Sequence, residues 1–420
     1  MGIIVQKFGG TSVADAQKIH NVARTAIKEF NKGNSVVVVV SAMGHTTDML
    51  VKLAKEVTDK PSPREIDMLL ATGEQVSIAL LAMAIQNEGG KAVSMNAMQV
   101  GIITESVHSS ARILEVKTDK IIKHLNAGEI VVVAGFQGVT PDFEITTLGR
   151  GGSDTSAVAI AAALKADRCD IYTDVEGVYT ADPRIVKHAR RAEEISYDEM
   201  LELARVGANV LHPRSVETAK QFDVPMRVRS SFNTENEGTL ITGVKNMEIC
   251  KPVAGVAADS SQERIVIADV HDEPGCAAKI FGTLANHNIS VDMIIQSIAK
   301  ASGTNDIAFT VDKKDTEEAV KLLEGLKTKN NYGEISVDKD IAKVSVVGAG
   351  MVDRPGIAAT MFRALADEKI NIKMIATSEI KISCLVAQNE AERALKIFCK
   401  VFDLETEEIA VVKGDLPPED

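Results

Sequence analysis

Lys7-Phe8-Gly9-Gly10-Thr11-Ser12-Val13 follows a short apolar run, Ile3-Ile4-Val5, near the start of the chain. The apolar run predicts a buried first strand, and the segment from about Ala14 to Phe30 has the pattern of a helix. A strand, a glycine turn and a helix N-terminus together form an anion site. The glycines let backbone N–H groups converge on a phosphate, and the helix dipole favours negative charge. The stretch therefore predicts a phosphate near Lys7.

This glycine turn differs from the better-known phosphate-binding motifs. Its lysine precedes the glycines, whereas the loop GxxxxGK[ST] places the lysine after them. The third glycine of the dinucleotide fingerprint is also missing. By itself the motif leaves the ligand open, and a tight structural turn with a solvated lysine is the alternative.

The composition indicates a soluble globular protein with more than one domain. The chain has 420 residues, too many for one ordinary core, and 45% of them are hydrophobic. Its formal net charge of −12 argues against a nucleic-acid binder, which needs a basic face. No signal peptide is visible, and no apolar run approaches the roughly 20 residues that span a bilayer. We therefore predict a cytoplasmic protein with no nucleic-acid or membrane partner.

The cysteines favour the same compartment. There are 5 of them, scattered and without a CxxC pair, which fits reduced thiols better than a disulfide framework or a zinc site. They are Cys169, Cys250, Cys276, Cys384 and Cys399.

Residues 1–240 alternate strand-like and helix-like segments. Several strand candidates are continuous β-branched runs, such as Val36-Val37-Val38-Val39-Val40, which is typical of strands buried on both faces. The alternation predicts an α/β domain in which helices cover a largely parallel sheet. The expected strands are Ile3–Gln6, Ser35–Ser41, Ile130–Ala134, Cys169–Thr173 and Met226–Arg229, and the other expected helices are Glu65–Gln86, Thr118–Leu125, Ser153–Leu164 and Tyr197–Val206.

An internal repeat occupies the rest of the chain. A polar stretch from Phe232 to Gly243 marks a domain boundary. Beyond it, residues 272–281 (DEPGCAAKIF) match residues 353–362 (DRPGIAATMF) at an offset of 81 residues. Each copy has the pattern of a strand, a Pro-Gly turn, an amphipathic helix and two further strands. Because α+β units of this size have small cores, we expect the two copies to pack together.

Arg150-Gly151-Gly152-Ser153-Asp154 forms a second glycine turn, ahead of an alanine-rich helix. A helix N-terminus again favours an anion, and the planar guanidinium of Arg150 suits a carboxylate or a phosphate. Ser153 and Asp154 have a simpler interpretation as helix caps, which stays open at this point.

Further polar candidates follow other predicted elements. Asp174 and Asp182 lie beyond the end of a strand, where ligands bind in open α/β sheets. They could hold Mg²⁺ through water or contact a nucleotide, and an acidic surface loop is the alternative. Glu74 interrupts a largely apolar helix, where it either faces solvent or meets a substrate ammonium. Hydroxyl groups at Ser41 and Thr46-Thr47 follow the valine-rich strand and are candidate donors to a phosphate or carboxylate.

Taken together, these motifs resemble the aspartate kinases, a group within the amino-acid kinase family, over essentially the whole chain. The resemblance implies a three-layer sandwich kinase domain with a largely parallel sheet, followed by two α+β ferredoxin-like ACT domains. The matching segments are Lys7–Val13, Ser41–Gly44, Thr46–Thr47, Ala71–Glu74, Thr146–Ala157, Thr173–Arg184 and Val228–Ser231.

The resemblance also implies the domain limits. The kinase domain is expected over residues 1–243 and the two ACT domains over 263–335 and 342–413. Residues 244–262 are expected to form a linker and a strand, Val253–Asp259, that completes the second ACT domain, so that the first is inserted within it.

The same resemblance assigns roles to single residues. Lys7 would stabilise charge on the moving phosphoryl group, Asp154 would orient Lys7, and Arg150 would bind the α-carboxylate of aspartate. Glu74 would pair with the substrate ammonium. The implied nucleotide contacts are Lys7, Phe8, Gly9, Gly10, Ser41, Ser153, Thr173, Asp174, Tyr179, Asp182, Arg184 and Asn209, and the implied aspartate contacts are Thr47, Glu74, Arg150, Gly151, Gly152 and Ser153.

The implied reaction is transfer of a phosphoryl group from ATP to the β-carboxylate of L-aspartate, the first step of lysine, threonine and methionine biosynthesis. That carboxylate is already ionised at neutral pH, so the reaction needs no general base, and none is evident. Mg²⁺ would come with ATP, and no metal site made only by protein side chains is expected. One position departs from the family, because Asn209 stands where many relatives carry a lysine.

Two rival functions stay open. The first is another amino-acid kinase, acting on glutamate, acetylglutamate, carbamate or a nucleotide; Arg150 with Glu74 favours a free α-amino acid. The second is a catalytically silent amino-acid sensor, which would be expected to lack Lys7, Arg150 or Asp154, and all three are present.

The ACT resemblance also implies regulation by lysine, threonine or both, bound between paired ACT units, and assembly into a dimer or a dimer of dimers. Some relatives add a small regulatory subunit from an internal start, for which Met247 is a candidate here. The implied effector contacts are Asp272, Gly275, Ala277, Gln296, Asn371 and Ile372, with turn and strand residues of no binding role as the alternative.

Overall fold

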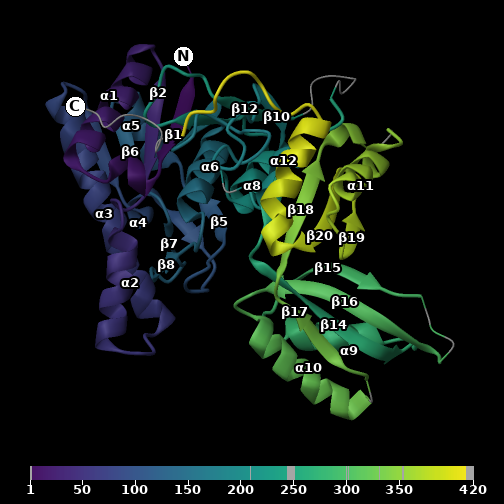
Figure 1. The fold of residues 1–420 in the computed structure, drawn as a ribbon. Helices are drawn as coiled ribbons and strands as arrows, with labels where there is room; N and C mark the ends of the chain where they lie inside the picture. Colours follow the sequence, from purple (N-terminus) through teal and green to yellow (C-terminus); the bar gives the residue numbers. More distant parts are fainter. Residues whose placement is uncertain are drawn as a thin grey trace.

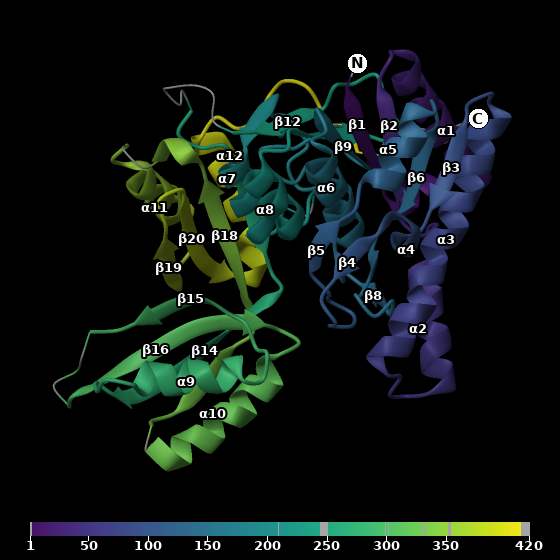
Figure 2. The same ribbon diagram turned by 180° about the vertical axis from the view of Figure 1, so that it is seen from behind.

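The computed structural model consists of a large α/β domain and two smaller α+β units (Figures 1 and 2). It describes residues 2–208, 210–243, 251–298, 300, 302–330, 332–351 and 354–412, and for residues 328–330 it describes the backbone only. Three positions named above, Asn209, Met247 and Cys250, lie outside the described residues, as does the start of the second repeat at Asp353.

The large domain is built on an eight-stranded sheet with the order β10-β12-β11-β9-β1-β2-β6-β3. From β11 to β3 neighbouring strands are parallel, whereas β12 runs antiparallel to β11 and parallel to β10. The predicted α/β class is therefore confirmed. The strands are β1 (Ile3–Phe8), β2 (Ser35–Val40), β3 (Ala92–Met95), β6 (Ile130–Ala134), β9 (Arg168–Thr173), β10 (Glu194–Ser196), β11 (Met226–Ser230) and β12 (Thr239–Thr242).

Helices cover both faces of this sheet, which makes three layers (Figure 1). Val36, Val38 and Val40 share a core with α1 and α3, whereas Val37 and Val39 share the opposite core with α4 to α8. Successive strand residues point to opposite faces, so the valine run is buried throughout. These helices are α1 (Ala16–Asn31), α3 (Pro63–Asn87), α4 (Ala97–Val100), α5 (Asp119–Asn126), α6 (Gly152–Leu164), α7 (Tyr197–Arg205) and α8 (Pro213–Phe222).

Helix α3 is long and apolar enough to cross a membrane by length and composition alone, with a mean hydropathy of 1.7 over 18 residues. Its inner face packs on β2, β3 and β6, and α2 (Thr46–Val57) packs beside it. Over half of that window is buried inside the protein, as in the core helix of a soluble domain. It is the one such helix in the described ranges.

A small second sheet, β5-β4-β7-β8, lies beside the main one and was not predicted. Its strands have only three or four residues, too few to show a period. They are β4 (Ile102–Thr104), β5 (Ile113–Val116), β7 (Gln137–Val139) and β8 (Ile145–Thr147). This sheet matters for the site because β8 leads directly into the second glycine turn.

The repeat folds as two four-stranded antiparallel sheets, each with two helices. The helices that follow the two Pro-Gly turns begin after Gly275 (φ +96°) and Gly356 (φ +104°), a backbone conformation that glycine adopts without strain. The first unit contains β14 (Gln262–His271), α9 (Cys276–Ala285), β15 (Val291–Gln296), β16 (Thr304–Asp312), α10 (Thr316–Asn330) and β17 (Ile335–Asp338). The second contains β18 (Ile341–Val347), α11 (Ile357–Asp367), β19 (Met374–Thr377), β20 (Lys381–Ala387) and α12 (Ala391–Val401).

One further strand links the two units. Strand β13 (Gly255–Asp259) precedes the first unit in the chain, yet it pairs antiparallel with β18 of the second. The two units also share a small core of Met293, Ile341, Met374 and Leu385. The first unit is thus inserted within the second, and the two pack together.

After α12 the chain returns to the large domain (Figure 1, yellow). The carbonyl oxygen of Leu404 accepts hydrogen bonds from the Thr180 hydroxyl (2.6 Å) and the Arg190 backbone N–H (3.0 Å). Isolated bridges pair Glu405 with Ala189 and Val412 with Val175. The C-terminal segment therefore runs along the loop between β9 and β10.

Candidate active site

Lys7 lies at the end of β1, where its Nζ is 2.6 Å from Oδ1 of Asp154 at the start of α6. Both side chains are nearly buried, with 12% and 13% of their surface exposed. Ser153, the neighbour of Asp154, accepts a hydrogen bond of 2.9 Å from the Ser41 hydroxyl. Helix α6 has no side-chain cap, so the capping interpretation of Ser153 and Asp154 was wrong.

The first glycine turn also differs in one respect from the expectation. Gly10 begins a short 3-10 turn, Gly10–Val13, and α1 begins only at Ala16, after the cap residue Asp15 accepts from the Lys18 N–H. The glycine turn therefore does not open directly into a long helix. It does need glycine, because a Cβ on Gly10 would lie 2.7 Å from the carbonyl oxygen of Ala42.

Arg150 stands between Gly149 (φ +77°) and Gly151 (φ +68°), both in a conformation that favours glycine. A Cβ on Gly151 would lie 2.2 Å from the side chain of His212, so the turn packs closely against His212. Arg150 itself is exposed, and it makes no ion pair with another described residue. Its guanidinium is free to meet a ligand.

Glu74 is buried in α3, with only 2% of its surface exposed. Its Oε1 accepts a 3.0 Å hydrogen bond from the backbone N–H of Ala42, the residue against which Gly10 packs. Its Oε2 is buried without a hydrogen-bond partner. Burial raises the pKa of Glu74 to about 7, although the Ala42 hydrogen bond acts against this. An unsatisfied carboxylate oxygen in such a place would gain from a cation.

Thr47 is half-exposed in the first turn of α2, close in the chain to Ser41 and Ala42. Thr46, beside it, donates its hydroxyl hydrogen to the Met43 carbonyl oxygen at 2.6 Å and so stays with the backbone. The ends of β1 and β2, the start of α6 and the middle of α3 are thereby connected through Lys7–Asp154, Ser41–Ser153 and Ala42–Glu74.

A second group of candidates lines one pocket of about 180 Å³ beyond the end of β9. Asp182 and Arg184 form a two-pronged ion pair there, with distances of 2.9 and 3.0 Å. Asp174 is exposed and accepts the Thr173 hydroxyl at 3.0 Å. Tyr179 also lines this pocket, as do Ala208 and Val210, the residues before and after position 209.

Part of that pocket comes from the second ACT-like unit, which sequence reasoning missed. Val256–Ala258 of β13, Leu395 of α12 and Val412 all line it. The Val256 N–H donates to the Thr180 carbonyl oxygen at 2.7 Å, which attaches β13 to the pocket loop. No local pattern could have revealed these contacts, because they join residues far apart in the chain.

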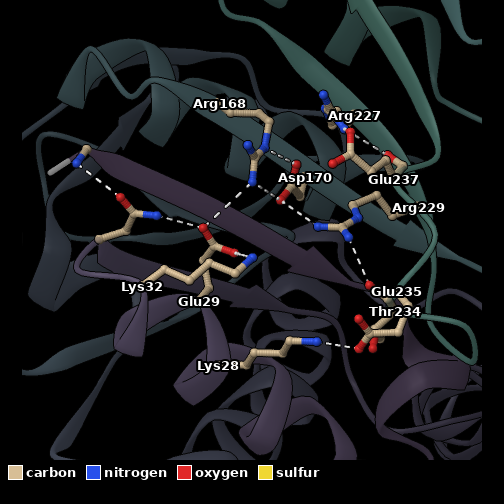
Figure 3. A network of polar contacts seen from close by, with 12 residues as sticks. Lys28, Glu29, Lys32, Arg168, Asp170, Arg227, Arg229, Thr234, Glu235 and Glu237 are labelled. Carbon is tan, nitrogen blue, oxygen red and sulfur yellow. Dashed lines mark hydrogen bonds and ion pairs between the residues drawn. The ribbon is translucent and has the colours of Figure 1, made fainter.

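A network of polar contacts connects side chains of β9 and β11 (Figure 3). Asp170, fully buried on β9, accepts two hydrogen bonds from Arg168 and lies 3.6 Å from Arg229 of β11. Arg229 in turn lies 5.5 Å from the ring centre of Tyr172, which stacks on Phe8 at 4.3 Å. The network thus reaches the residue that precedes Gly9, and it holds β1, β9 and β11 in register.

Among the described residues, no three His, Cys, Asp or Glu side chains are grouped so that they could hold a metal ion. Asp154 and Asp182 are already paired with Lys7 and Arg184. Asp174 is exposed and makes no ion pair with a described residue.

The effector candidates fall on the two ACT-like units. Asp272, Gly275, Ala277 and Gln296 are exposed on the first unit, where Asp272 accepts from the Asn305 amide at 3.2 Å. Asn371 is exposed and Ile372 half-buried on the second unit. Among the described residues no hydrogen bond or ion pair joins these two sets.

The fold and the site define a phosphotransferase class: an α/β domain with two glycine turns and a lysine at the strand ends. Comparison with known proteins agrees. The profile of the amino acid kinase family matches residues 2–230, and an ACT domain profile matches residues 264–325 and 344–402. "Aspartokinase 2" of Bacillus subtilis is 54% identical, covering 98% of this chain and 100% of that protein.

Two solved structures of E. coli aspartokinase III are similar over nearly their whole length. The complex with aspartate and ADP (R-state) has a TM-score of 0.82 at 29% identity, covering 96% of this chain and 100% of that one. The complex with lysine and aspartate (T-state) has a TM-score of 0.75 at 29% identity, covering 95% and 99%. The chain therefore belongs to the aspartokinases, within the amino acid kinase family, and the two repeated units are ACT domains.

Proposed function

We propose that the protein transfers the γ-phosphoryl group of ATP to the β-carboxylate of L-aspartate and so forms 4-phospho-L-aspartate. The observation that carries this proposal is the buried, unpartnered Oε2 of Glu74, whose other carboxylate oxygen is bound to Ala42, the residue against which Gly10 packs. A substrate ammonium would satisfy that oxygen, and the free guanidinium of Arg150 would bind an α-carboxylate. Together they describe a site for a free α-amino acid.

The proposed roles follow the contacts. Lys7, held by Asp154, would meet the phosphate oxygens, and the N–H groups at Gly9 and Gly10 would support them. Thr47 and Ser153 would assist Arg150 on the substrate. Asp174, Tyr179, Asp182 and Arg184, with the chain around Asn209, would line the nucleotide pocket. Catalysis would come from positioning and charge stabilisation, since the attacking carboxylate is already ionised.

Mg²⁺ fits this site as a partner of the nucleotide. When bound, it would supply positive charge on the phosphate oxygens. Asp174 would contact it through water, because its carboxylate is exposed and is the least engaged of the acidic candidates. We also propose a cytoplasmic location, which fits the reduced state of the described cysteines Cys169, Cys276, Cys384 and Cys399.

A coupled assay of ADP formation tests the substrate. ADP should appear only when L-aspartate is added with ATP and Mg²⁺. Equal turnover with L-glutamate would contradict the aspartate assignment and favour the rival amino-acid kinase. Turnover with neither amino acid, in protein that binds them, would favour the silent sensor.

Glu74 predicts a pH dependence of substrate binding. It must be ionised to pair with an ammonium, and its pKa lies near 7 instead of 4.5. The KM for aspartate should therefore rise as the pH falls below about 7, by up to about tenfold per pH unit. KM should be measured from pH 5.5 to 8.5 in the wild-type protein and in Glu74→Gln, in which KM should be high throughout and lose this pH dependence.

The raised pKa of Glu74 also predicts how the stability of the protein changes with pH. Between pH 4.5 and about 7 the folded protein holds a proton on Glu74 that the unfolded chain releases. The contribution of Glu74 to the free energy of unfolding should therefore fall as the pH rises through this window, and Glu74→Gln should remove it. A stability profile that is identical in both proteins would contradict a raised pKa.

We propose that lysine, threonine or both regulate the enzyme through the ACT domains. The second ACT domain is attached to the kinase domain by Lys381–Glu202 (2.8 Å) and by the Ala349 N–H, which donates to Glu199 (3.0 Å). Its strand β13 also lines the nucleotide pocket. A shift of this domain would therefore reach the nucleotide directly.

We further propose that the effector site is shared between two chains. Apart from the half-buried Ile372, the candidate residues of each ACT domain are exposed in one chain, and a second copy would bring the two sets together. The assembly would be a dimer, or a dimer of dimers, through the ACT domains. A separate regulatory subunit from Met247 belongs to the same proposal.

Asp272 tests the effector site. Asp272→Asn should raise the concentration of lysine or threonine needed for half-inhibition by about tenfold, because a carboxylate that binds an ammonium is lost. The kcat without effector should stay unchanged. The exposed neighbour Glu273→Gln is the control and should keep wild-type inhibition. Removal of everything after Gly243 is a less specific test, since it also removes walls of the nucleotide pocket.

A further inference from the structure

Asp67 is a fully buried carboxylate on α3 that none of the roles above uses. It lies two helical turns before Glu74, and both residues are on the buried face of the helix. Its Oδ2 lies 2.9 Å from Nδ1 of the partly exposed His108. A buried carboxylate needs several hydrogen-bond donors, so the donors to Asp67 show which parts of the chain it holds in place.

Asp67 joins two segments that are far apart in the chain. It accepts the backbone N–H of Ser109 at 2.9 Å and that of Thr147 at 3.0 Å, both on Oδ2. The Thr147 hydroxyl donates to Oδ1 at 2.6 Å. Ser109 has a φ of +66°, an unfavourable conformation for serine that this contact helps to hold.

Arg214 also joins the same two segments. Its guanidinium donates to the Leu148 carbonyl oxygen at 2.8 Å and to the Ala111 carbonyl oxygen at 2.6 Å. Ala111 also donates its own N–H to the Thr147 carbonyl oxygen at 3.0 Å. The chain just before Gly149 is therefore held both by a carboxylate and by a guanidinium.

This arrangement bears directly on Arg150. Thr147 and Leu148 immediately precede the turn Gly149–Gly152, in which Gly149 packs against the Ser109 carbonyl oxygen and Gly151 against His212. Arg150 makes no ion pair of its own to a described residue, so its position depends on this backbone.

We propose that Asp67 is a positioning residue for aspartate binding: through Thr147 and Ser109 it holds the turn that carries Arg150. Because Asp67 and Glu74 are on one rigid helix, α3 sets the position of the group that binds the α-carboxylate relative to the group that binds the ammonium. The inference rests on the proposed function, in which Arg150 and Glu74 bind aspartate. The selectivity of the enzyme for a free α-amino acid would then come from the spacing that α3 imposes between Arg150 and Glu74.

Asp67→Asn is the first test. An amide presents donors toward the Ser109 and Thr147 N–H groups, so the turn should loosen while the nucleotide pocket stays intact. The KM for aspartate should rise by about tenfold or more, and the KM for ATP should change less than about twofold. Glu65→Gln is the matched control, because it neutralises an exposed carboxylate on the same helix and should leave both values unchanged.

Thr147 supplies a second test that does not depend on the folding of Asp67→Asn. Thr147→Val has nearly the same shape and removes only the hydroxyl that donates to Asp67. It should raise the KM for aspartate about threefold to fivefold, whereas Thr147→Ser should keep the wild-type value. Thermal unfolding of each variant shows whether a change in KM merely follows lost stability.

The outcomes are distinct. Wild-type KM for aspartate in both Asp67→Asn and Thr147→Val would overturn the positioning role, as would an equal rise in the KM values for aspartate and ATP. If the wild-type protein itself does not turn over aspartate, the proposed function fails, and that result is separate from the comparison of variants. A selective rise in the KM for aspartate, reversed in Thr147→Ser, supports the inference.

Discussion

Lys7→Ala is expected to lower kcat by about a thousandfold or more, the largest effect of any single change proposed for this protein. Lys7 lies at the end of β1 beside the glycine turn, with its Nζ 2.6 Å from Asp154. In the proposed reaction it is the side-chain cation that stabilises charge on the phosphoryl group as it moves toward a negatively charged carboxylate. Without it, repulsion between the two anions is no longer offset on the protein side.

The measurement is kcat for aspartate-dependent ADP formation at saturating substrates. Lys18→Ala is the matched control, since Lys18 is a half-exposed lysine that pairs with Asp15 on the neighbouring turn. Asp154→Asn should also lower kcat, but less than Lys7→Ala, because Asp154 orients the lysine without itself touching the phosphate. Near-normal turnover in Lys7→Ala would refute the assignment of this turn as the phosphate site.

Arg150→Ala is expected to raise the KM for aspartate by about a hundredfold, because a two-pronged, charge-assisted contact with the α-carboxylate is lost. The KM for ATP should stay close to the wild-type value. Arg150 is exposed and makes no ion pair with the described residues, so the unfolding temperature should not change. The expected defect is therefore one of substrate binding alone.

Arg150→Lys sharpens this test. Lysine keeps the charge but loses the planar fork, and we expect it to recover only part of the lost affinity. Arg112→Ala, a change at another highly exposed arginine in the same region, is the control and should behave as wild type. An equal rise in the KM values for ATP and aspartate would instead place Arg150 on the nucleotide.

Much of the kinase fold could be predicted from local patterns. The valine run of β2 alternates between two cores, as expected for a strand covered on both faces. The start of α1 was placed too early, because residues 10–13 form a 3-10 turn and the helix is capped by Asp15. That cap was visible in the sequence as an aspartate just before an apolar-periodic segment. The small second sheet left no such signal, since its strands are too short for a period.

The site divides in the same way. Glycine turns and strand ends indicated anion sites, but the pairing of Lys7 with Asp154 joins residues far apart in the chain, and only the family resemblance suggested it. Local reasoning even favoured Ser153 and Asp154 as caps, which they are not. The ACT-domain walls of the nucleotide pocket and the role of Asp67 depend wholly on tertiary contacts. Their residues carry no pattern that a sequence alone would show.

The central claim is that the β-carboxylate of aspartate becomes phosphorylated, and its product gives the most direct test. The wild-type protein should be incubated with ATP, Mg²⁺, L-aspartate and hydroxylamine, which traps an acyl phosphate as a hydroxamate. The account predicts aspartate β-hydroxamate in amounts equal to the ADP formed, and none when L-glutamate replaces aspartate or when Lys7 is alanine. ADP formation without the aspartyl hydroxamate, or hydroxamate formed equally well from glutamate, would contradict it.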